Sequence, residues 1–535
     1  MTENPIFEGL VKALGGLGIA ESSSGIPEEI QSCKDPVDVL RAVYVLLGSR
    51  RGITISDNDV EENRKALREI AEHVGNAMLP ILDIEPSDED KTDYKSLELK
   101  GQLGLRILNS LTEKYDVELG SRTLISTVAF SSSDDSWTTT ASAELSRKLL
   151  EDHFGSQVEQ QQKRARFIAE DVLYDFLRPL FSKSRPATVT ASGRKAEFVE
   201  PSRYDNASAE AEAQKPWKYG RRYAITVFGW ALLNSDESIL QKSWHLFTPV
   251  LLTLLDEPQT ALKVRALSLF RSFWARCPAD LMRQTGLAQV FEDAIFPAVL
   301  YLPELTPVDE SVVILGAAYP ALMAIAGIGI GIDSESRATT DELQQNSGNP
   351  FDTFTAEQQK LLARIIREGI LVGYHHASEH VRLVELLCEQ LRYIINRMGI
   401  LTIKHLKHLI PMVTEIITEP FGTQYPPGLS AAIRLLHAIL RTCWPRIPHY
   451  SNDIIKALMI CWLNVEEEDS FPGDDGHPGA AELEAELTKA ADMLSAVMRA
   501  ADIDMYERVS PLIKTEPHLG KLFKSASITT TTSDA

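Results

Sequence analysis

Cysteine is scarce in this sequence, and no two cysteines stand close together. Cys33, Cys277, Cys388, Cys443 and Cys461 form no CxxC pair, and their number is odd. Widely spaced thiols of this kind are not expected to build a disulfide framework or a zinc site, and they are typical of a reducing compartment. The sequence therefore predicts a cytoplasmic protein whose thiols pack as small hydrophobic groups, and access to the nucleus is left open.

Positive charge is also in short supply. The chain has 54 Lys and Arg residues against 75 Asp and Glu residues, and its formal net charge is -21. A surface of this sign repels phosphate backbones, so nucleic acid is not expected as a direct partner. The basic and aromatic run at residues 215–223 is interpreted as a helix entry with Trp217 packed inside, and contact with an acidic protein segment is the alternative.

Long apolar runs are missing as well. No basic region precedes the apolar part of the first residues, as a signal peptide requires. No later apolar stretch is seen to reach the roughly 18 to 20 residues that span a bilayer. The sequence therefore predicts no membrane partner.

Strand-like alternation is rare, and apolar residues recur at helical spacing instead. They do so in stretches of about 12 to 20 residues that end at Pro, Gly, Asp or Ser. With 535 residues, 44% of them hydrophobic, the chain can build a long continuous core. Residues 240–255 and 262–274 each carry one apolar stripe, and a break at residues 256–258 separates them. This pattern predicts an antiparallel pair of helices.

Three residues of this pair resemble the HEAT repeat pattern. They are Pro249 in the first helix, Asp256 at the turn and Arg265 at the start of the second helix. In HEAT repeats the proline bends the first helix, and an aspartate and an arginine tie neighbouring turns together. The resemblance therefore implies that these three residues contribute to repeat stacking.

The same proline device recurs along the chain. Pro80, Pro179, Pro249, Pro297 and Pro411 each lie in an apolar helical segment and precede two apolar residues. Because an interior proline destabilises a helix by about 3 kcal/mol, repeated use of it indicates a shared kinked architecture, although each proline could instead start a separate helix. The predicted fold is all-α, an α-solenoid of degenerate HEAT-like (armadillo-type) helix pairs.

Polar stretches divide the chain into predicted blocks, which are expected to stack continuously and not to form independent domains. Their boundaries follow the changes from apolar helical spacing to polar, small-residue-rich sequence. In chain order the blocks are an N-terminal helical block at 1–182, a flexible polar insertion at 183–215, central HEAT-like helix pairs at 216–326, a flexible loop at 327–352, a C-terminal helical block at 353–524 and a disordered tail at 525–535.

Sequence motifs for catalysis are few and weak. His376, Glu379 and His380 match the H-x-x-E-H spelling of inverted zinc peptidases, and on a helix the two histidines would share one face. A third ligand is missing, so a solvated helix start is the favoured interpretation. The glycines at 327–332 fit no phosphate-binding pattern and predict a helix-terminating glycine followed by a loop, while His405 predicts a polar, exposed helix face. We therefore expect a protein that is not an enzyme and holds no cofactor and no metal.

Three segments of the central block carry a family resemblance. They are KPWKYGRRYAITVFGWALLN at residues 215–234, TPVLLTLLDE at 248–257 and LMRQTGLAQVFEDAIFPAVLYLPELTPVDESVVILGAAYPAL at 281–322. The stretch that contains them, about a fifth of the chain, resembles the family of Tel-two-interacting protein two in its fungal form.

That resemblance implies a HEAT-like helical fold and membership of the TTT co-chaperone complex, together with Tel-two and Tel-two-interacting protein one. The complex works with the ninety-kilodalton heat-shock chaperone and its R2TP adaptor. It supports the maturation of phosphatidylinositol-3-kinase-related kinases such as TOR, ATM and ATR. The family offers no catalytic residues to carry over, so the implied activity is binding.

We expect a rigid, curved array that presents one elongated face to another helical-repeat subunit, with a partner surface more basic than this one. The predicted interface residues are Arg283, Tyr301, Tyr319, Trp444 and Tyr450. Ordinary packing at helix ends is the alternative for each of them. Two other functions are kept as alternatives: a HEAT-repeat transport or cargo adaptor, and a zinc hydrolase that uses the H-x-x-E-H motif.

Overall fold

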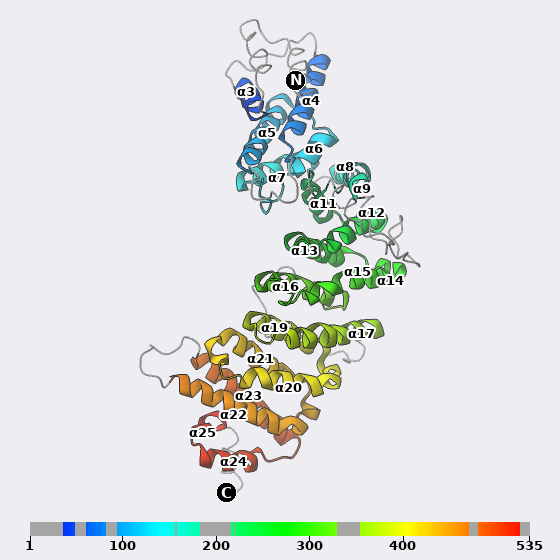
Figure 1. The fold of residues 1–535 in the computed structure, drawn as a ribbon. Helices are drawn as coiled ribbons and strands as arrows, with labels where there is room; N and C mark the ends of the chain where they lie inside the picture. The colour runs from blue at the N-terminus through cyan, green and yellow to red at the C-terminus, as the bar shows by residue number, and fades with distance from the viewer. Residues whose placement is uncertain are drawn as a thin grey trace. The chain divides into compact units, whose positions relative to one another are not determined.

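The computed structural model shows a helical protein (Figure 1). Within the residues that it describes, every regular element is a helix and no strand occurs, so the predicted all-α class is confirmed. The chain forms two compact units, Met1–Asp256 with Arg276–Leu287, and Glu257–Ala275 with Ala288–Ala535. The structure describes residues 36–48, 60–81, 94–155, 158–181, 215, 217–218, 220–328, 354–469 and 480–524.

In the first unit, helices pack against the next helix but one. Helix α3 contacts α5, α5 contacts α7, and α4 contacts α6, so successive helices alternate between two layers as in an α-solenoid. The described helices of this unit are α3 (Pro36–Gly48), α4 (Val60–Met78), α5 (Tyr94–Tyr115), α6 (Ser121–Val128), α7 (Thr140–Phe154), α8 (Val158–Arg166), the π-helix η3 (Phe167–Leu177), α9 (Arg178–Phe181), α11 (Tyr223–Leu233), α12 (Glu237–Asp256) and α14 (Ala279–Thr285).

Close approach of the backbone shapes the core of the first unit. A Cβ atom at Gly101 of α5 would lie 2.3 Å from a ring carbon of Phe130, so only glycine fits there. Further along, Trp217 is fully buried and stacks on Phe181, with ring centroids 5.0 Å apart. This placement confirms that Trp217 is a packing residue.

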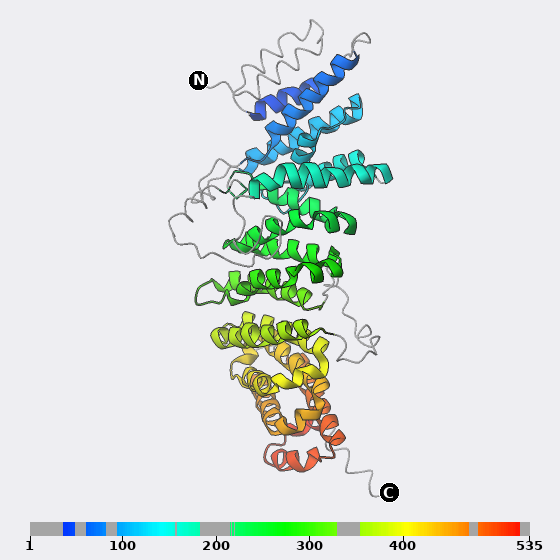
Figure 2. The ribbon, with the colours of Figure 1, turned by 90° about the vertical axis from the view of Figure 1, so that its right-hand side faces the viewer.

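The second unit has the same two-layer order, and its later helices are drawn in yellow to red in Figure 2. Helices α19, α21 and α23 contact one another in succession, and α20 contacts α22 in the other layer. Its elements are α13 (Thr260–Arg276), α15 (Leu287–Ile295), η5 (Phe296–Leu300), α16 (Val308–Ile325), α17 (Ala356–Arg364), the π-helix η7 (Ile365–Leu371), α18 (Val372–Ala377), α19 (Val381–Met398), η8 (Gly399–His405), α20 (Leu406–Thr418), η9 (Gly422–Gln424), α21 (Pro426–Thr442), η10 (Trp444–Tyr450), α22 (Ser451–Asp469), α23 (Ala480–Ala500), α24 (Met505–Thr515) and α25 (Leu519–Leu522).

The proline device takes three forms. Pro249 and Pro411 lie inside α12 and α20, as predicted. Pro179 and Pro297 lie where the helix type changes, from the π-helix η3 to α9 and from α15 to the 3-10 helix η5. Pro80 follows the end of α4, so its predicted place inside a helix is wrong. Two of the five predicted prolines therefore lie inside an α-helix with helix on both sides.

Helix α16 is long and apolar enough to cross a membrane by length and composition, which corrects the expectation that no apolar stretch reaches that length. Half of this segment is buried, and α16 packs against η5 and α19. We therefore interpret α16 as a core helix of the second unit.

Gly327 ends α16 as the sequence predicted. Its φ of 81° is left-handed, its N–H donates to the carbonyl of Ala324, and the N–H of Ile328 donates to that of Met323. Apart from residues 215, 327 and 328, the predicted flexible segments 183–215, 327–352 and 525–535 lie outside the described residues. The predicted block boundaries stay predictions.

Candidate interaction surface

The H-x-x-E-H motif does not lie on one helix. Helix α18 ends at Ala377 and α19 begins at Val381, so Glu379 and His380 fall in the turn between them. His376 Nδ1 instead lies 3.0 Å from the carboxylate of Glu304. Among the described residues, no group of three or more His, Cys, Asp or Glu side chains could hold a metal ion. The described structure therefore does not assemble this motif into a zinc-peptidase site.

His405 is a core residue, although the sequence predicted an exposed polar face. Only 4% of it is exposed, its Nε2 has no hydrogen-bond partner, and burial lowers its pKa to about 4. The positive charge of the nearby Lys404 is a smaller contribution to the same lowering of the pKa. Two cysteines behave as predicted, since Cys388 and Cys461 are buried and burial raises the pKa of each thiol to about 12.

Tyr319 is likewise a core residue. Its side chain is fully buried in α16, and its hydroxyl has no hydrogen-bond partner. A Cβ atom at Gly369 would lie 3.3 Å from the Tyr319 ring, so a glycine in the π-helix η7 leaves room for it. Burial raises the pKa of the Tyr319 hydroxyl. This placement corrects the predicted interface role of Tyr319, because a fully buried ring does not reach a partner.

The other predicted interface residues lie nearer the surface. Tyr301 is half-buried, with the Lys263 ammonium 5.3 Å from its ring centroid. Trp444 is 51% exposed, and Tyr450 is half-buried at the end of the same short helix, η10. The side chain of Arg283 lies outside the described part of the structure. For these four residues the interface role stays a prediction.

The predicted stacking residues fall in different units. Pro249 and Asp256 belong to α12 of the first unit, and Arg265 belongs to α13 of the second. Asp256 is exposed at the end of its helix, whereas Arg265 is half-buried. The tie between neighbouring turns therefore stays a prediction.

Polar links that the sequence did not reveal join neighbouring helices of the second unit. At the start of α19 the Tyr425 hydroxyl donates to Glu385 over 2.7 Å, and at its end Arg441 donates to Asn396 over 2.7 Å. Residues early in α19 therefore face residues early in α21, which means that the two helices run parallel. Arg382 also pairs with an aspartate at the start of α16.

A Cβ atom at Gly316, further along α16, would lie 3.5 Å from Leu386, further along α19, so α16 runs in the same direction. The turns that precede these three parallel helices therefore lie at one edge of the unit. We name residues 300–310, 372–382 and 419–426 the turn edge. Large apolar side chains are exposed on all three segments of it. Their exposed fractions are 46% for Leu300, 92% for Leu305, 38% for Val372, 48% for Val381 and 74% for Phe421.

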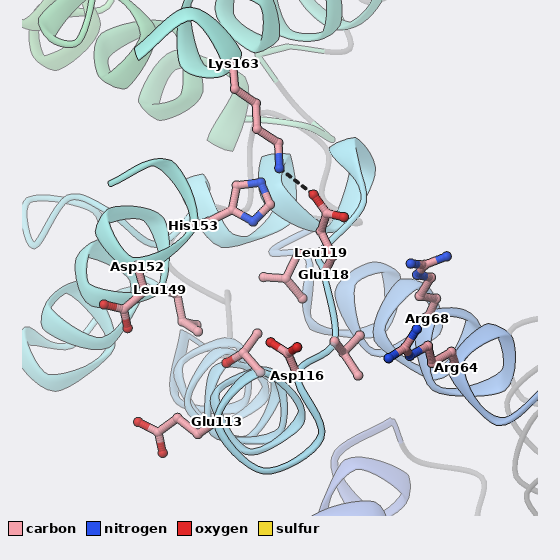
Figure 3. Close-up of a pocket in the computed structure, with 12 residues that line it drawn as sticks. Arg64, Arg68, Glu113, Asp116, Glu118, Leu119, Leu149, Asp152, His153 and Lys163 are labelled. Atoms are coloured by element: carbon pink, nitrogen blue, oxygen red, sulfur yellow. Dashed lines mark hydrogen bonds and ion pairs between the residues drawn. The ribbon is translucent and has the colours of Figure 1, made fainter. Parts of the chain in front are cut away.

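The first unit holds a different kind of feature, a cleft of about 550 Å³ (Figure 3). Arg64 and Arg68 of α4 line one part of it, and Glu118 lines it with Lys163, which forms an ion pair with that glutamate. Burial and the Lys163 charge lower the pKa of the lining residue His153. The remaining lining residues are Thr112, Glu113, Asp116, Val117, Leu119, Leu149 and Asp152. Lining carboxylates slightly outnumber lining cations, so the cleft is not a strong anion site.

Comparison with known proteins shows to which family the chain belongs. The Tti2 family matches residues 123–424, which is more than half of the chain. The chain belongs to the Tti2 family. TELO2-interacting protein 2 of Rattus norvegicus is 25% identical over 263 residues, which cover 48% of this chain and 45% of the rat protein. The match therefore spans somewhat less than half the length of that curated relative.

The residue range that matches the Tti2 family covers the turn edge and the cleft to different extents. It includes nearly all of the turn edge, up to Gln424. Four lining residues of the cleft lie inside it, and the other eight precede residue 123. The exposed apolar row thus belongs entirely to the part of the chain that defines the family.

Solved structures of the karyopherin Kap121p are also similar in part. One is 11% identical, covers 97% of this chain and 48% of that chain, and has a TM-score of 0.37. Another, bound to the SUMO protease Ulp1p, is 10% identical, covers 93% and 46%, and has a TM-score of 0.38. Likeness at this level lends no weight to the transport-adaptor alternative.

Proposed function

We propose that this chain is a non-catalytic scaffold subunit of the TTT co-chaperone complex. The observation that carries the proposal is the Tti2-family match over residues 123–424. The rat relative is named for its interaction with TELO2, and we extend that interaction to this chain. Its direct partners would be the Tel-two homologue and the Tel-two-interacting protein one homologue.

The geometry supports binding more than chemistry. The described helices stack in two layers, an arrangement that offers broad surfaces to other proteins. The motif with the strongest catalytic spelling, at residues 376–380, is split by the end of a helix. The cleft of the first unit is lined by cations and carboxylates together, without a lining Ser or Cys for nucleophilic attack.

As a subunit of that complex, the chain would support the maturation and stability of phosphatidylinositol-3-kinase-related kinases. It would do so with the ninety-kilodalton heat-shock chaperone and R2TP, in the cytoplasm, with nuclear access left open. The chain would contribute no cofactor and no catalytic residue, and its action would depend on which surfaces it presents.

Affinity purification of the full chain with quantitative mass spectrometry tests this proposal. We expect the Tel-two and Tel-two-interacting protein one homologues at amounts similar to that of the chain itself, with chaperone and kinases at lower amounts. Depletion of the chain should also lower the steady-state amount of the kinases. Recovery of a transport GTPase in place of the Tel-two homologue would instead establish the transport adaptor.

A further inference from the structure

The turn edge exposes several large apolar side chains to solvent, although turns are usually covered by polar residues. A single exposed leucine or valine is ordinary on a protein surface, but large apolar side chains on successive, adjacent turns mark interaction sites. Leu305 and Phe421 are 92% and 74% exposed, and Val381 between them is 48% exposed. Each lies in or directly beside a different turn, so the row is built by stacking and not by one flexible loop.

Contacts between the turns hold this row in place. The Glu304 carboxylate lies 3.0 Å from His376 Nδ1, which ties the turn of Leu305 to the end of α18. A Cβ atom at Gly428 would lie 3.6 Å from the carbonyl oxygen of Val381, so the third turn is close to the second.

Hydrogen bonds inside each turn add to this order, and in the second turn the N–H of His380 donates to the carbonyl of Ala377 over 3.0 Å. The N–H groups of Leu305 and Thr306 both donate to Leu302, each over 3.0 Å. The Phe421 carbonyl accepts from the N–H of Gln424 over 3.1 Å. A surface fixed in advance loses little conformational entropy when a partner binds.

The charge around the row is mostly negative. Within the turn edge, Arg382 is the single arginine or lysine, and it pairs with one of the acids. The acidic residues of the same segments are Glu304, Asp309, Glu310, Glu379 and Glu419. Two copies of such a surface repel each other, and the net charge of -21 adds to that repulsion. Complementarity instead favours a partner that surrounds apolar side chains with lysine or arginine.

We propose that the turn edge docks a basic surface of another protein subunit, whose apolar side chains cover Leu305, Val381 and Phe421. This inference rests on the proposed function, because it takes the Tel-two and Tel-two-interacting protein one homologues as the candidate partners. The apolar residues would supply affinity, and the acidic rim would speed association and select the partner.

Binding of the purified full chain to each purified partner tests the proposal. The double variant Leu305→Ser/Phe421→Ser should bind one of the partners at least about tenfold more weakly. The matched control Val45→Ser/Leu233→Ser removes residues that are 66% and 54% exposed elsewhere, and it should bind within about twofold of the original chain. Thermal unfolding of all chains should remain similar, because the substituted side chains are largely exposed.

A charge variant gives an independent measure. Glu379→Lys/Glu419→Lys should slow association several-fold and weaken the salt dependence of binding, since it reverses the acidic rim. If the original chain binds neither partner, the proposed function fails. If it binds and both turn-edge variants bind equally well, the turn-edge inference alone is overturned. Conversion of a self-associated chain to a monomer by the apolar variant would overturn it too, because the edge would then join two copies.

Discussion

The cleft of the first unit and the turn edge of the second unit place their charged groups differently. In the cleft, cations and carboxylates line one hollow, and Lys163 pairs there with Glu118. On the turn edge, ion pairs join neighbouring turns, and the large apolar side chains face outward. A hollow of mixed charge suits water and small polar groups, whereas an ordered apolar row within an acidic rim suits a protein.

The exposure of a residue is therefore informative only together with its surroundings. A concave feature attracts attention first, yet eight of the twelve lining residues of the cleft lie outside the range that matches the Tti2 family. The turn edge has no hollow, but its apolar row lies entirely within that range. Substitutions that separate folding from binding can test this contrast between the cleft and the turn edge.

The largest effect is expected at Tyr319, which the sequence assigned to an interface and the structure assigns to the core. Tyr319→Ala should lower the free energy of unfolding by about 3–5 kcal/mol, because it empties a fully buried aromatic site. Tyr319→Phe should leave the free energy of unfolding unchanged or raise it by up to about 1–2 kcal/mol, because it removes a buried hydroxyl that has no hydrogen-bond partner. Chemical denaturation and partner binding are measured together. A Tyr319→Phe chain that folds normally but no longer binds would restore the interface role.

A smaller effect is expected at Gly101 in the first unit. Gly101→Ala should lower the free energy of unfolding by about 1–3 kcal/mol, because the new Cβ atom would clash with Phe130. The energetic cost of this clash exceeds the stabilisation that the higher helix propensity of alanine provides. Gly316→Ala in α16 is the matched control. Its Cβ would lie 3.5 Å from Leu386, an ordinary contact, so this variant should be neutral or more stable by up to about 1 kcal/mol. Equal effects in thermal unfolding would contradict the close approach at Gly101.

A pH-dependent effect is expected at His405. Its folded-state pKa of about 4 lies below the unfolded value near 6.5, so the unfolded chain binds the proton first as the pH falls. The stability that the neutral side chain provides is complete above about pH 6.5 and is lost between there and pH 4, at no more than about 1.4 kcal/mol per pH unit. His405→Gln should flatten this part of the stability profile, and His408→Gln, at an exposed site, should not. Identical profiles for the original chain and His405→Gln would contradict the burial.

The smallest effect is expected in the cleft. Lys163→Ala should change the free energy of unfolding by less than about 1 kcal/mol, because both partners of its ion pair are about half exposed. It should also leave binding to the proposed partner, the Tel-two homologue, within about twofold, as titration calorimetry can measure. A larger loss of binding would move the docking surface from the turn edge to the cleft.

The helical fold could be predicted from the sequence because the spacing of apolar residues indicates which side of each helix is buried. In α19, Leu383, Leu387, Leu391 and Ile394 follow that spacing, and all are buried. The same rule could have placed Tyr319 correctly, since it stands at core spacing from Leu315 and Leu322 of α16. Tyr319 also lies in the segment with the family resemblance, and for that reason it was predicted at the interface and not in the core.

The turn edge could not be predicted in the same way. Leu305 and Phe421 stand more than a hundred residues apart, and only the stacking of parallel helices brings their turns to one edge. A local signal existed, since each is a large apolar residue inside a proline-containing turn, LPELTP and EPFGTQYPP. Such a residue is either buried beneath its turn or exposed on it, and spacing does not distinguish the two. The zinc motif failed for a related reason, because its spelling does not reveal where α18 ends.

Hydrogen–deuterium exchange of the full chain, alone and bound to the partners proposed for it, locates the docking surface on the chain. We expect slower exchange in peptides that cover 300–310, 372–382 and 419–426 when the partner is bound, and unchanged exchange around the cleft residues Arg64 and Glu118. Protection at the cleft with none at the turn edge would contradict the account.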